Sequence, residues 1–314
     1  MNIIFFGSSE FAVPSLKALI SNSYKVSCVV TQPDKQKGRG LLLAPTVIKT
    51  VAEESSLTIY QPQRINAPEA IKFLRDLNPD LFVVVSYGQI LSREILEIPK
   101  IFPINVHGSL LPKYRGAAPI NWAIINGEKT TGISIIKITE KLDAGPIILQ
   151  KKVDISDDGT SVTLENTLSL SGAELLIDSL KRIANNDYTL TDQEEDKVIF
   201  APKLKKQDGL IDWQKCAKDI YNLIRGCVNW PGAFTYYHAR LLKIYRAEVI
   251  PLSGCPVAHK AGEIIKVSKD GIIVATGEDN LIIEELQIEG ARRMGVEEFI
   301  AGHKIQLGEI LAKK

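Results

Sequence analysis

The first 31 residues, MNIIFFGSSEFAVPSLKALISNSYKVSCVVT, decide the fold class. Residues 2–6 form an apolar run that ends in the turn-like segment GSSE, which predicts a buried strand. Pro14 stands where a helix has its first turn, and the apolar residues from Leu16 onward mark the buried face of that helix. Residues 25–31 are again strand-like. A strand, a helix and a strand in this order are typical of a parallel sheet wound with helices.

The same alternation continues to about residue 185. Short β-branched runs at residues 80–85, 101–105 and 132–138 have the composition of buried central strands, and residues 161–183 have helical spacing. We therefore predict an α/β fold over residues 1–188, with a doubly wound, mostly parallel, Rossmann-like sheet.

The second part of the chain has a different texture. Residues 189–207 are polar, charged and interrupted by proline, which indicates a linker, and residues 213–227 have helical spacing. Short alternating strands bounded by glycine and proline follow at residues 233–237, 241–250, 262–267, 271–275 and 280–289. This pattern is typical of a small antiparallel barrel or sandwich, and we expect an OB-like β-barrel over residues 208–314.

Composition narrows the classes of function. The 314 residues are 45% hydrophobic and 24% charged, and no apolar run approaches the ~20 residues of a membrane span. The net charge of +1 creates no field that would mark a nucleic-acid partner. The four cysteines include no CxxC pair, so we expect reduced structural thiols. With no leader segment before the first strand, we expect a cytoplasmic protein, and we expect a monomer.

Two kinds of cofactor are disfavoured by the motifs. The GSSE segment after the first strand lacks the later glycines of a dinucleotide-binding fingerprint. The chain also has no HExxH motif and no cluster of cysteine and histidine at metal-ligand spacing. We therefore expect neither NAD nor a metal.

The segment richest in candidate catalytic residues is NVHGSLLPKYRGAAP at residues 105–119, which begins where a strand is predicted to end. Ligands of parallel sheets bind beyond the carboxyl ends of the strands. Asn105 and His107 are two residues apart, so while the strand persists their side chains share one face of the sheet. An amide N–H and an imidazole can then converge on one carbonyl group.

A second motif, LDAGP at residues 142–146, follows the next predicted strand, and we expect it at the same carboxyl edge. Asp143 can then reach His107, fix its tautomer and favour its protonated form. Acyl transfer to an amine uses an oxyanion donor, worth ~10²–10³ in rate, and an acid or base, worth ~10²–10⁴. The structural alternative makes Asn105 and Asp143 turn residues and His107 a satisfied interior histidine.

Together these motifs closely resemble those of the folate-dependent formyltransferase family, and the similarity covers essentially the whole chain. The resemblance implies transfer of a formyl group from 10-formyltetrahydrofolate, as co-substrate and without a metal, to an amine. It implies Asn105, His107 and Asp143 as the catalytic residues. It further implies a folate site made by Ser109, Leu110, Leu111, Pro112, Val84, Ser86, Tyr87, Gly88 and Ile90.

Within the family, the resemblance is to members that formylate the α-amine of methionine on initiator tRNA, which gives N-formylmethionyl-tRNA for translation initiation. It implies that residues 31–40, TQPDKQKGRG, belong to a loop that contacts the acceptor end of the tRNA, and that the C-terminal barrel assists. Leu41, Leu42 and Leu43 stand where basic residues are usual. The candidate tRNA contacts are Lys35, Lys37, Arg39, Lys203, Lys205 and Lys206, although a solvated surface is the alternative for each basic cluster.

Other acceptors and roles remain open. The amine could belong to an amino sugar nucleotide or to glycinamide ribonucleotide, water could replace it in a formyltetrahydrofolate hydrolase, or the chain could bind folate or RNA without catalysis. We expect direct attack by the neutral amine, because no serine or cysteine is an obvious activated nucleophile. Asn105 and His107 then stabilise the oxyanion, His107 also carries the proton, and Asp143 positions and tunes His107.

Overall fold

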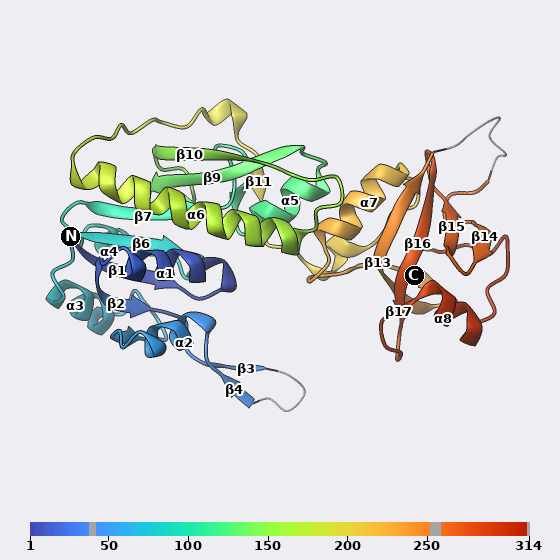
Figure 1. Cartoon of the computed structure of the whole chain (residues 1–314), viewed down its shortest axis with the longest axis horizontal. Coiled ribbons are helices and arrows are strands. Elements are labelled where there is room, and N and C mark those ends of the chain that lie inside the picture. The colour runs from blue at the N-terminus through green and yellow to red at the C-terminus, as the bar shows by residue number, and fades with distance from the viewer. Residues whose placement is uncertain (38–41, 252–258, 313–314) are drawn as a thin grey trace. The chain divides into compact units, whose positions relative to one another are not determined.

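The computed structural model describes residues 1–37, 42–251 and 259–312, and the chain forms two compact units (Figure 1). The first unit comprises Met1–Pro119, Thr130–Asp154 and Glu165–Ala201, and the second comprises Ile120–Lys129, Ile155–Leu164 and Pro202–Lys314. Residues 189–201, which the sequence places in a linker, thus lie in the first unit.

A seven-stranded sheet forms the centre of the first unit, in the order β10-β9-β7-β6-β1-β2-β5. Its strands are β1 (Asn2–Gly7), β2 (Lys25–Val30), β5 (Ile59–Tyr60), β6 (Leu81–Val85), β7 (Phe102–His107), β9 (Thr130–Lys137) and β10 (Ile147–Asp154). Neighbouring strands from β7 to β5 run parallel, whereas β9 runs antiparallel to both β7 and β10. The predicted mostly parallel sheet is confirmed, with β9 as a reversed strand.

Helices cover this sheet on both faces. α6 (Ser161–Ala184) lies against one face, and it comes so close that a Cβ at Gly172 would be 3.0 Å from Val106 of β7. On the other face Phe6 and Phe82 pack with Leu74 of α3 (Pro68–Asp76) in a buried cluster. Further helical segments of this unit are η1 (Glu10–Ala12), α1 (Val13–Ser21), α2 (Val47–Glu54), α4 (Arg93–Leu96) and η2 (Glu195–Lys197).

Two short strand pairs lie outside the main sheet. β3 (Lys35–Lys37) pairs with β4 (Leu42–Ala44), so these strands form the two arms of a hairpin. β8 (Arg115–Gly116) pairs with β11 (Phe200–Ala201). A Cβ at Gly116 would lie 2.5 Å from the carbonyl oxygen of Ala201, so the close approach of these strands requires glycine.

The second unit contains an antiparallel sheet in the order β12-β13-β16-β15-β14, with β17 beside β16. Its elements are α5 (Pro119–Ile125), η3 (Lys206–Gly209), α7 (Ala217–Gly226), β12 (Ala233–Tyr237), β13 (Arg240–Ile250), β14 (Ile264–Ser268), β15 (Gly271–Ala275), β16 (Asn280–Ile288), β17 (Met294–Gly295) and α8 (Val296–Gly302). Ala312 exchanges backbone hydrogen bonds with Tyr236 of β12, and Glu309 accepts one from Ile264 of β14. The C-terminal segment therefore joins the two edge strands. The predicted antiparallel β domain is confirmed.

The start of α7 corrects one expectation. Helical spacing predicts a helix from residue 213, but α7 begins at Ala217. Trp213 is instead buried in the core of the second unit, where its indole N–H donates to Thr235 Oγ1 at 3.0 Å. A buried indole needs a partner for its N–H, and the strand supplies this partner in place of a helical turn.

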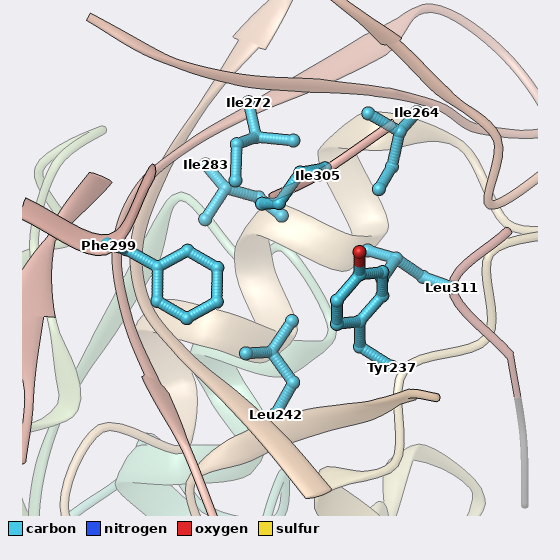
Figure 2. Close-up of a pocket in the computed structure, with 8 residues that line it drawn as sticks. All are labelled: Tyr237, Leu242, Ile264, Ile272, Ile283, Phe299, Ile305 and Leu311. Carbon is cyan, nitrogen blue, oxygen red and sulfur yellow. The ribbon is translucent and has the colours of Figure 1, made fainter. Parts of the chain in front are cut away.

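Apolar side chains of the antiparallel sheet, of α8 and of the C-terminal segment pack together in the core of the second unit (Figure 2). They enclose a residual cavity of about 10 Å³ between Tyr237, Phe299 and the surrounding aliphatic residues, which is at the lower limit for one water molecule. We therefore assign this cavity to the core of the second unit.

Among the described residues, no helix has both the length and the apolar composition of a membrane span.

Candidate active site

β7 carries the first two predicted catalytic residues. The strand continues to His107, two residues beyond the predicted end, so Asn105 and His107 lie on the same face of the sheet. Val106 between them packs under α6 on the opposite face. Asn105 is half-buried and the side chain of His107 is 6% exposed. Both polar groups therefore face away from α6.

Asp143 reaches them by an unexpected route. The sequence places it at the carboxyl edge shared with β7, but β9 is antiparallel and its last residue, Lys137, lies beside Ile104. The expected direction of this strand is therefore wrong, because β9 runs antiparallel to β7. The loop after β9 folds back, and a Cβ at Gly145 would be 1.7 Å from the carbonyl oxygen of Lys137. Glycine is needed here because the returning loop lies against the strand that it leaves.

The carboxylate of Asp143 is the point where the site converges. Its Oδ2 accepts a hydrogen bond from the backbone N–H of Gly116 at 2.9 Å and lies 3.7 Å from Nδ1 of His107. Its Oδ1 lies 3.4 Å from Nδ2 of Asn105. The structure thus brings Asn105, His107 and Asp143 together, although they come from two distant segments of the chain.

The tautomer of His107 follows from its partners. Nε2 lies 2.9 Å from the backbone oxygen of Tyr114, and a carbonyl oxygen can only accept, so Nε2 carries a hydrogen. In the neutral ring Nδ1 is then the basic nitrogen, and it faces the Asp143 carboxylate.

The loop that carries the predicted folate residues Ser109, Leu110, Leu111 and Pro112 is held on the same face of the sheet. Ser109 Oγ donates to the Lys113 oxygen at 2.6 Å, which closes the loop on itself. Ser134 of β9, which pairs with His107, accepts from the Leu111 N–H at 3.0 Å and donates to the Ser109 oxygen at 2.7 Å. Gln150 of β10 donates to the Leu111 oxygen at 2.9 Å.

The other predicted folate residues follow the carboxyl end of β6. Val84 pairs with Asn105 and is half-buried, and Ser86 and Gly88 have φ of 52° and 89°. Tyr87 is buried, with its ring 5.4 Å from that of Phe6, whereas the side chain of Ile90 is 80% exposed. This turn therefore exposes Ser86, Gly88 and the apolar side chain of Ile90, which suits a flat, partly apolar ligand. Tyr87 contributes packing beneath it.

The candidate tRNA contacts lie in two separate segments. Lys35 is exposed on β3, Lys37 ends that strand, and Arg39 lies outside the described residues. Leu43 of β4 is 72% exposed, so one of the leucines that replace the usual basic residues faces solvent. In the second unit Lys203, Lys205 and Lys206 are exposed around the buried Leu204. The first cluster belongs to the first unit and the second cluster to the second unit.

The base of the β3–β4 hairpin is anchored to the first unit. Asp34 accepts from Lys49 Nζ of α2 at 2.7 Å and from Gln61 Nε2 at 2.7 Å. These bonds, first that from Lys49 and then that from Gln61, hold the pKa of the Asp34 carboxyl below its usual range. The hairpin therefore starts from a fixed point, whatever its far end contacts.

The sequence did not single out several residues that shape this site. Ser134 and Gln150 hold the loop of residues 109–112. Arg115 and Gln193 are buried polar residues that hydrogen-bond to each other, and Gln193 also bonds to the Asp143 oxygen. Ser134, Gln150 and Gln193 lie outside the quoted motifs, and Arg115, although inside the motif at residues 105–119, has its side-chain partners about 80 residues away. A usable signal was the presence of polar residues in otherwise apolar strands, as with Ser134 among isoleucines.

Comparison with known proteins gives consistent results over the whole chain. The family model described as formyl transferase matches residues 1–180, and the model of its C-terminal domain matches residues 203–304. A methionyl-tRNA formyltransferase from Acetivibrio thermocellus is 45% identical over 313 residues, which is 100% of both chains. A protein of the same name from Caldanaerobacter subterraneus is 46% identical, over 99% of this chain and 100% of the relative.

Solved structures with this fold also exist. An N-formyltransferase from Helicobacter canadensis, in complex with folinic acid and dTDP-3-aminofucose, is 18% identical with a TM-score of 0.65. The similarity covers 90% of this chain and 98% of that one. At this identity the likeness concerns the fold alone.

Proposed function

This chain belongs to the formyl transferase family, and we propose that it transfers a formyl group from 10-formyltetrahydrofolate to the α-amine of methionyl initiator tRNA. The product is N-formylmethionyl-tRNA, the charged tRNA that begins translation. Relatives of that name at 45% and 46% identity, similar from end to end, support this acceptor. We further propose a cytoplasmic location, because charged initiator tRNA is used there.

One observation carries the chemical part of the proposal. Asp143 lies 3.7 Å from Nδ1 of His107 and 3.4 Å from Nδ2 of Asn105. An amide donor, a titratable ring and a carboxylate thus meet on one face of the sheet, next to the loop of residues 109–112. These groups can supply the oxyanion donor and the acid or base that acyl transfer to an amine uses.

The reaction proceeds by direct attack of the neutral amine on the formyl carbon. The new C–N bond forms to the amine, the carbonyl oxygen becomes an oxyanion, and the bond to the folate nitrogen then breaks. Asn105 donates its amide N–H to the oxyanion, where one such donor is worth ~10²–10³ in rate. His107 accepts the amine proton at Nδ1, the positive charge of the resulting imidazolium stabilises the oxyanion, and the proton then passes to the departing folate nitrogen. Asp143 orients the ring and stabilises its protonated form.

The second unit assists tRNA binding in this proposal. Lys203 and Lys205 are exposed just before η3, Lys206 is exposed as its first residue, and Lys35 is exposed on the β3–β4 hairpin. Contacts from lysines to phosphates carry no direct sequence information, so they fix the position of the acceptor arm. Loss of any of these lysines should weaken tRNA binding and reduce its salt dependence, with no effect on folate binding.

The proposal is tested by a panel of acceptors. The wild-type protein is supplied with 10-formyltetrahydrofolate and, separately, Met-charged initiator tRNA, free methionine, an amino sugar nucleotide, glycinamide ribonucleotide or water alone. We expect rapid formylation of the charged initiator tRNA and slow or no turnover with the others. Turnover of an amino sugar nucleotide in place of charged tRNA would transfer the proposal to the other acceptor class. Tetrahydrofolate release with water alone, at the same rate, would identify a hydrolase.

A further inference from the structure

Gln193 holds the loop that carries Asp143. Its Nε2 donates to the backbone oxygens of Asp143 at 2.8 Å and Gly145 at 2.7 Å, and its Oε1 accepts from Arg115 Nε at 2.9 Å. The residue is 9% exposed. Two carbonyl oxygens can only accept and a guanidinium N–H can only donate, so the orientation of the amide is fixed by its partners. Both N–H groups of the side-chain amide and one of the two lone pairs of Oε1 are therefore used.

Arg115 connects Gln193 to the carboxylate of Asp143. Arg115 is 4% exposed, and the next residue, Gly116, donates its N–H to Asp143 Oδ2. Gln193 therefore holds the backbone of Asp143, and the Arg115–Gly116 strand holds its carboxylate. The guanidinium also pairs with Glu195, at 2.9 Å from Nη2 to Oε1. Arg115 is therefore hydrogen-bonded to both residue 193 and residue 195. The result is a closed ring of contacts around Asp143.

The backbone of Asp143 needs such a restraint. Its φ is +48°, in the left-handed region that costs energy for any residue with a side chain. The side chain of Leu142 is 63% exposed, so apolar packing holds this part of the loop only weakly. Hydrogen bonds from Gln193 to the Asp143 and Gly145 oxygens supply the restraint directly.

We propose that Gln193 is a positioning residue for catalysis, which keeps the Asp143 carboxylate within reach of His107 and Asn105. This inference rests on the proposed function, because it presumes that Asp143 acts with His107. Gln193 acts on Asp143 through the loop backbone. The segment expected as a linker thereby becomes a working part of the catalytic unit.

The test uses two substitutions in the full-length protein. Gln193→Leu removes all three bonds, and Gln193→Glu keeps the size and the Arg115 contact but replaces the donor to the two carbonyl oxygens. In both we expect kcat for formyl transfer to fall by about 10- to 100-fold, the range caused by misplacing a catalytic group by about 1 Å, with KM for folate nearly unchanged. Asp192→Asn, in the exposed neighbour of Gln193, is the matched control and should retain wild-type kcat.

Double substitution separates positioning from general stability. In an Asp143→Asn background, Gln193→Leu should change kcat by less than a factor of about 2, because the group that it positions is already lost. A purely structural role would cost the same factor in both backgrounds, and that result would overturn the proposal. So would wild-type kcat in Gln193→Leu and Gln193→Glu.

Hydrogen exchange gives a readout independent of the acceptor. In Gln193→Leu the amides of residues 138–146 should exchange faster, and in Asp192→Asn they should not. Unchanged exchange in that loop would refute the positioning role even if the enzyme is active. Conversely, faster exchange in a protein that does not formylate charged tRNA would refute the proposed acceptor and leave the role of Gln193 in holding the loop intact.

Discussion

At the scale of single residues, Gly145 decides whether Asp143 can reach the site. The loop after β9 turns back so tightly that an added Cβ would lie 1.7 Å from the Lys137 oxygen, far inside contact distance. The oxygen belongs to the backbone of a central strand, so it cannot move aside easily. Any side chain at this position must therefore displace the loop, and Asp143 moves with it.

We accordingly expect Gly145→Ala to lower kcat by about 100-fold, the effect of a displacement of about 1 Å at a catalytic group. Binding of folate should change little, because Ser134 and Gln150 hold residues 109–112 independently of this loop. Steady-state kinetics with charged initiator tRNA measure the effect. Gly302→Ala is the control, since a Cβ there meets nothing within 4 Å; comparable loss in both variants would refute this explanation.

At this scale the sequence predicted which three side chains lie together, but it predicted a wrong route for one of them. Asn105 and His107 were identifiable because alternate residues of a strand share a face, and the strand indeed extends through both. Asp143 was chosen for a shared carboxyl edge, although β9 runs the opposite way. Gln193 was missed because its partners, Arg115 and the Asp143 loop, lie 78 and 50 residues away.

At the scale of elements, the β3–β4 hairpin projects from a base that is fixed by charge. Asp34 joins Lys49 of α2 and Gln61 after β5, so three segments meet beneath the hairpin. Because the pKa of Asp34 is lowered in the folded protein, its ionised form is the one that stabilises this junction. That contribution is present above the ordinary carboxyl pKa of 3.8 and is lost as pH falls through the lower folded value.

For Asp34→Asn we expect a several-fold rise in KM for charged tRNA and no change in KM for folate, because the variant loosens the hairpin and leaves the sheet intact. The stability difference from wild type should shrink as pH is lowered below 3.8. Kinetics and urea titrations at several pH values measure both effects. A change in KM for folate equal to that for tRNA would show that Asp34 supports the folate site instead.

Helices and strands were predictable where the pattern of apolar residues within a short stretch of sequence is enough to define them. The apolar runs of β1, β2, β6 and β7 and the long α6 are found within a few residues of their predicted bounds. The direction of β9 was not predictable, since its Ile-rich sequence suits a strand in either direction. The start of α7 was placed too early because Trp213 has helical spacing, yet it packs into the sheet.

At the scale of the whole molecule, each unit has its own core and carries a buried cysteine that reports on it. Cys28 lies in the first unit and Cys227 in the second, and both are fully buried. Burial raises the pKa of each thiol from 9.0 to about 12. Each folded unit therefore favours the neutral, unreactive form of its thiol.

We therefore expect iodoacetamide at mildly alkaline pH to label the half-buried Cys216 in the native protein, and Cys28 and Cys227 only as their units unfold in urea. Mass spectrometry of the peptides gives a separate unfolding midpoint for each unit. Labelling of Cys28 or Cys227 without denaturant would contradict the described cores.

The same thiols predict a loss of stability in alkali. Because the folded pKa is raised, each thiol's contribution to the free energy of unfolding is complete below pH 9 and declines as pH rises from there towards 12. Cys28→Ser, which replaces the thiol by a hydroxyl that does not titrate in this range, should flatten that decline in the first unit. An equally steep decline in the variant would assign it to other groups.

The central claim is that Asn105, His107 and Asp143 catalyse formyl transfer to charged initiator tRNA. The most direct measurement is the single-turnover rate of formylmethionyl-tRNA formation by wild type and by His107→Ala, both saturated with 10-formyltetrahydrofolate. We predict rapid transfer by wild type and a rate ~10²–10⁴-fold lower in the variant, which is the contribution of a positioned acid or base. A variant within a few-fold of wild type, or a wild type that leaves the charged tRNA unformylated, would contradict the account.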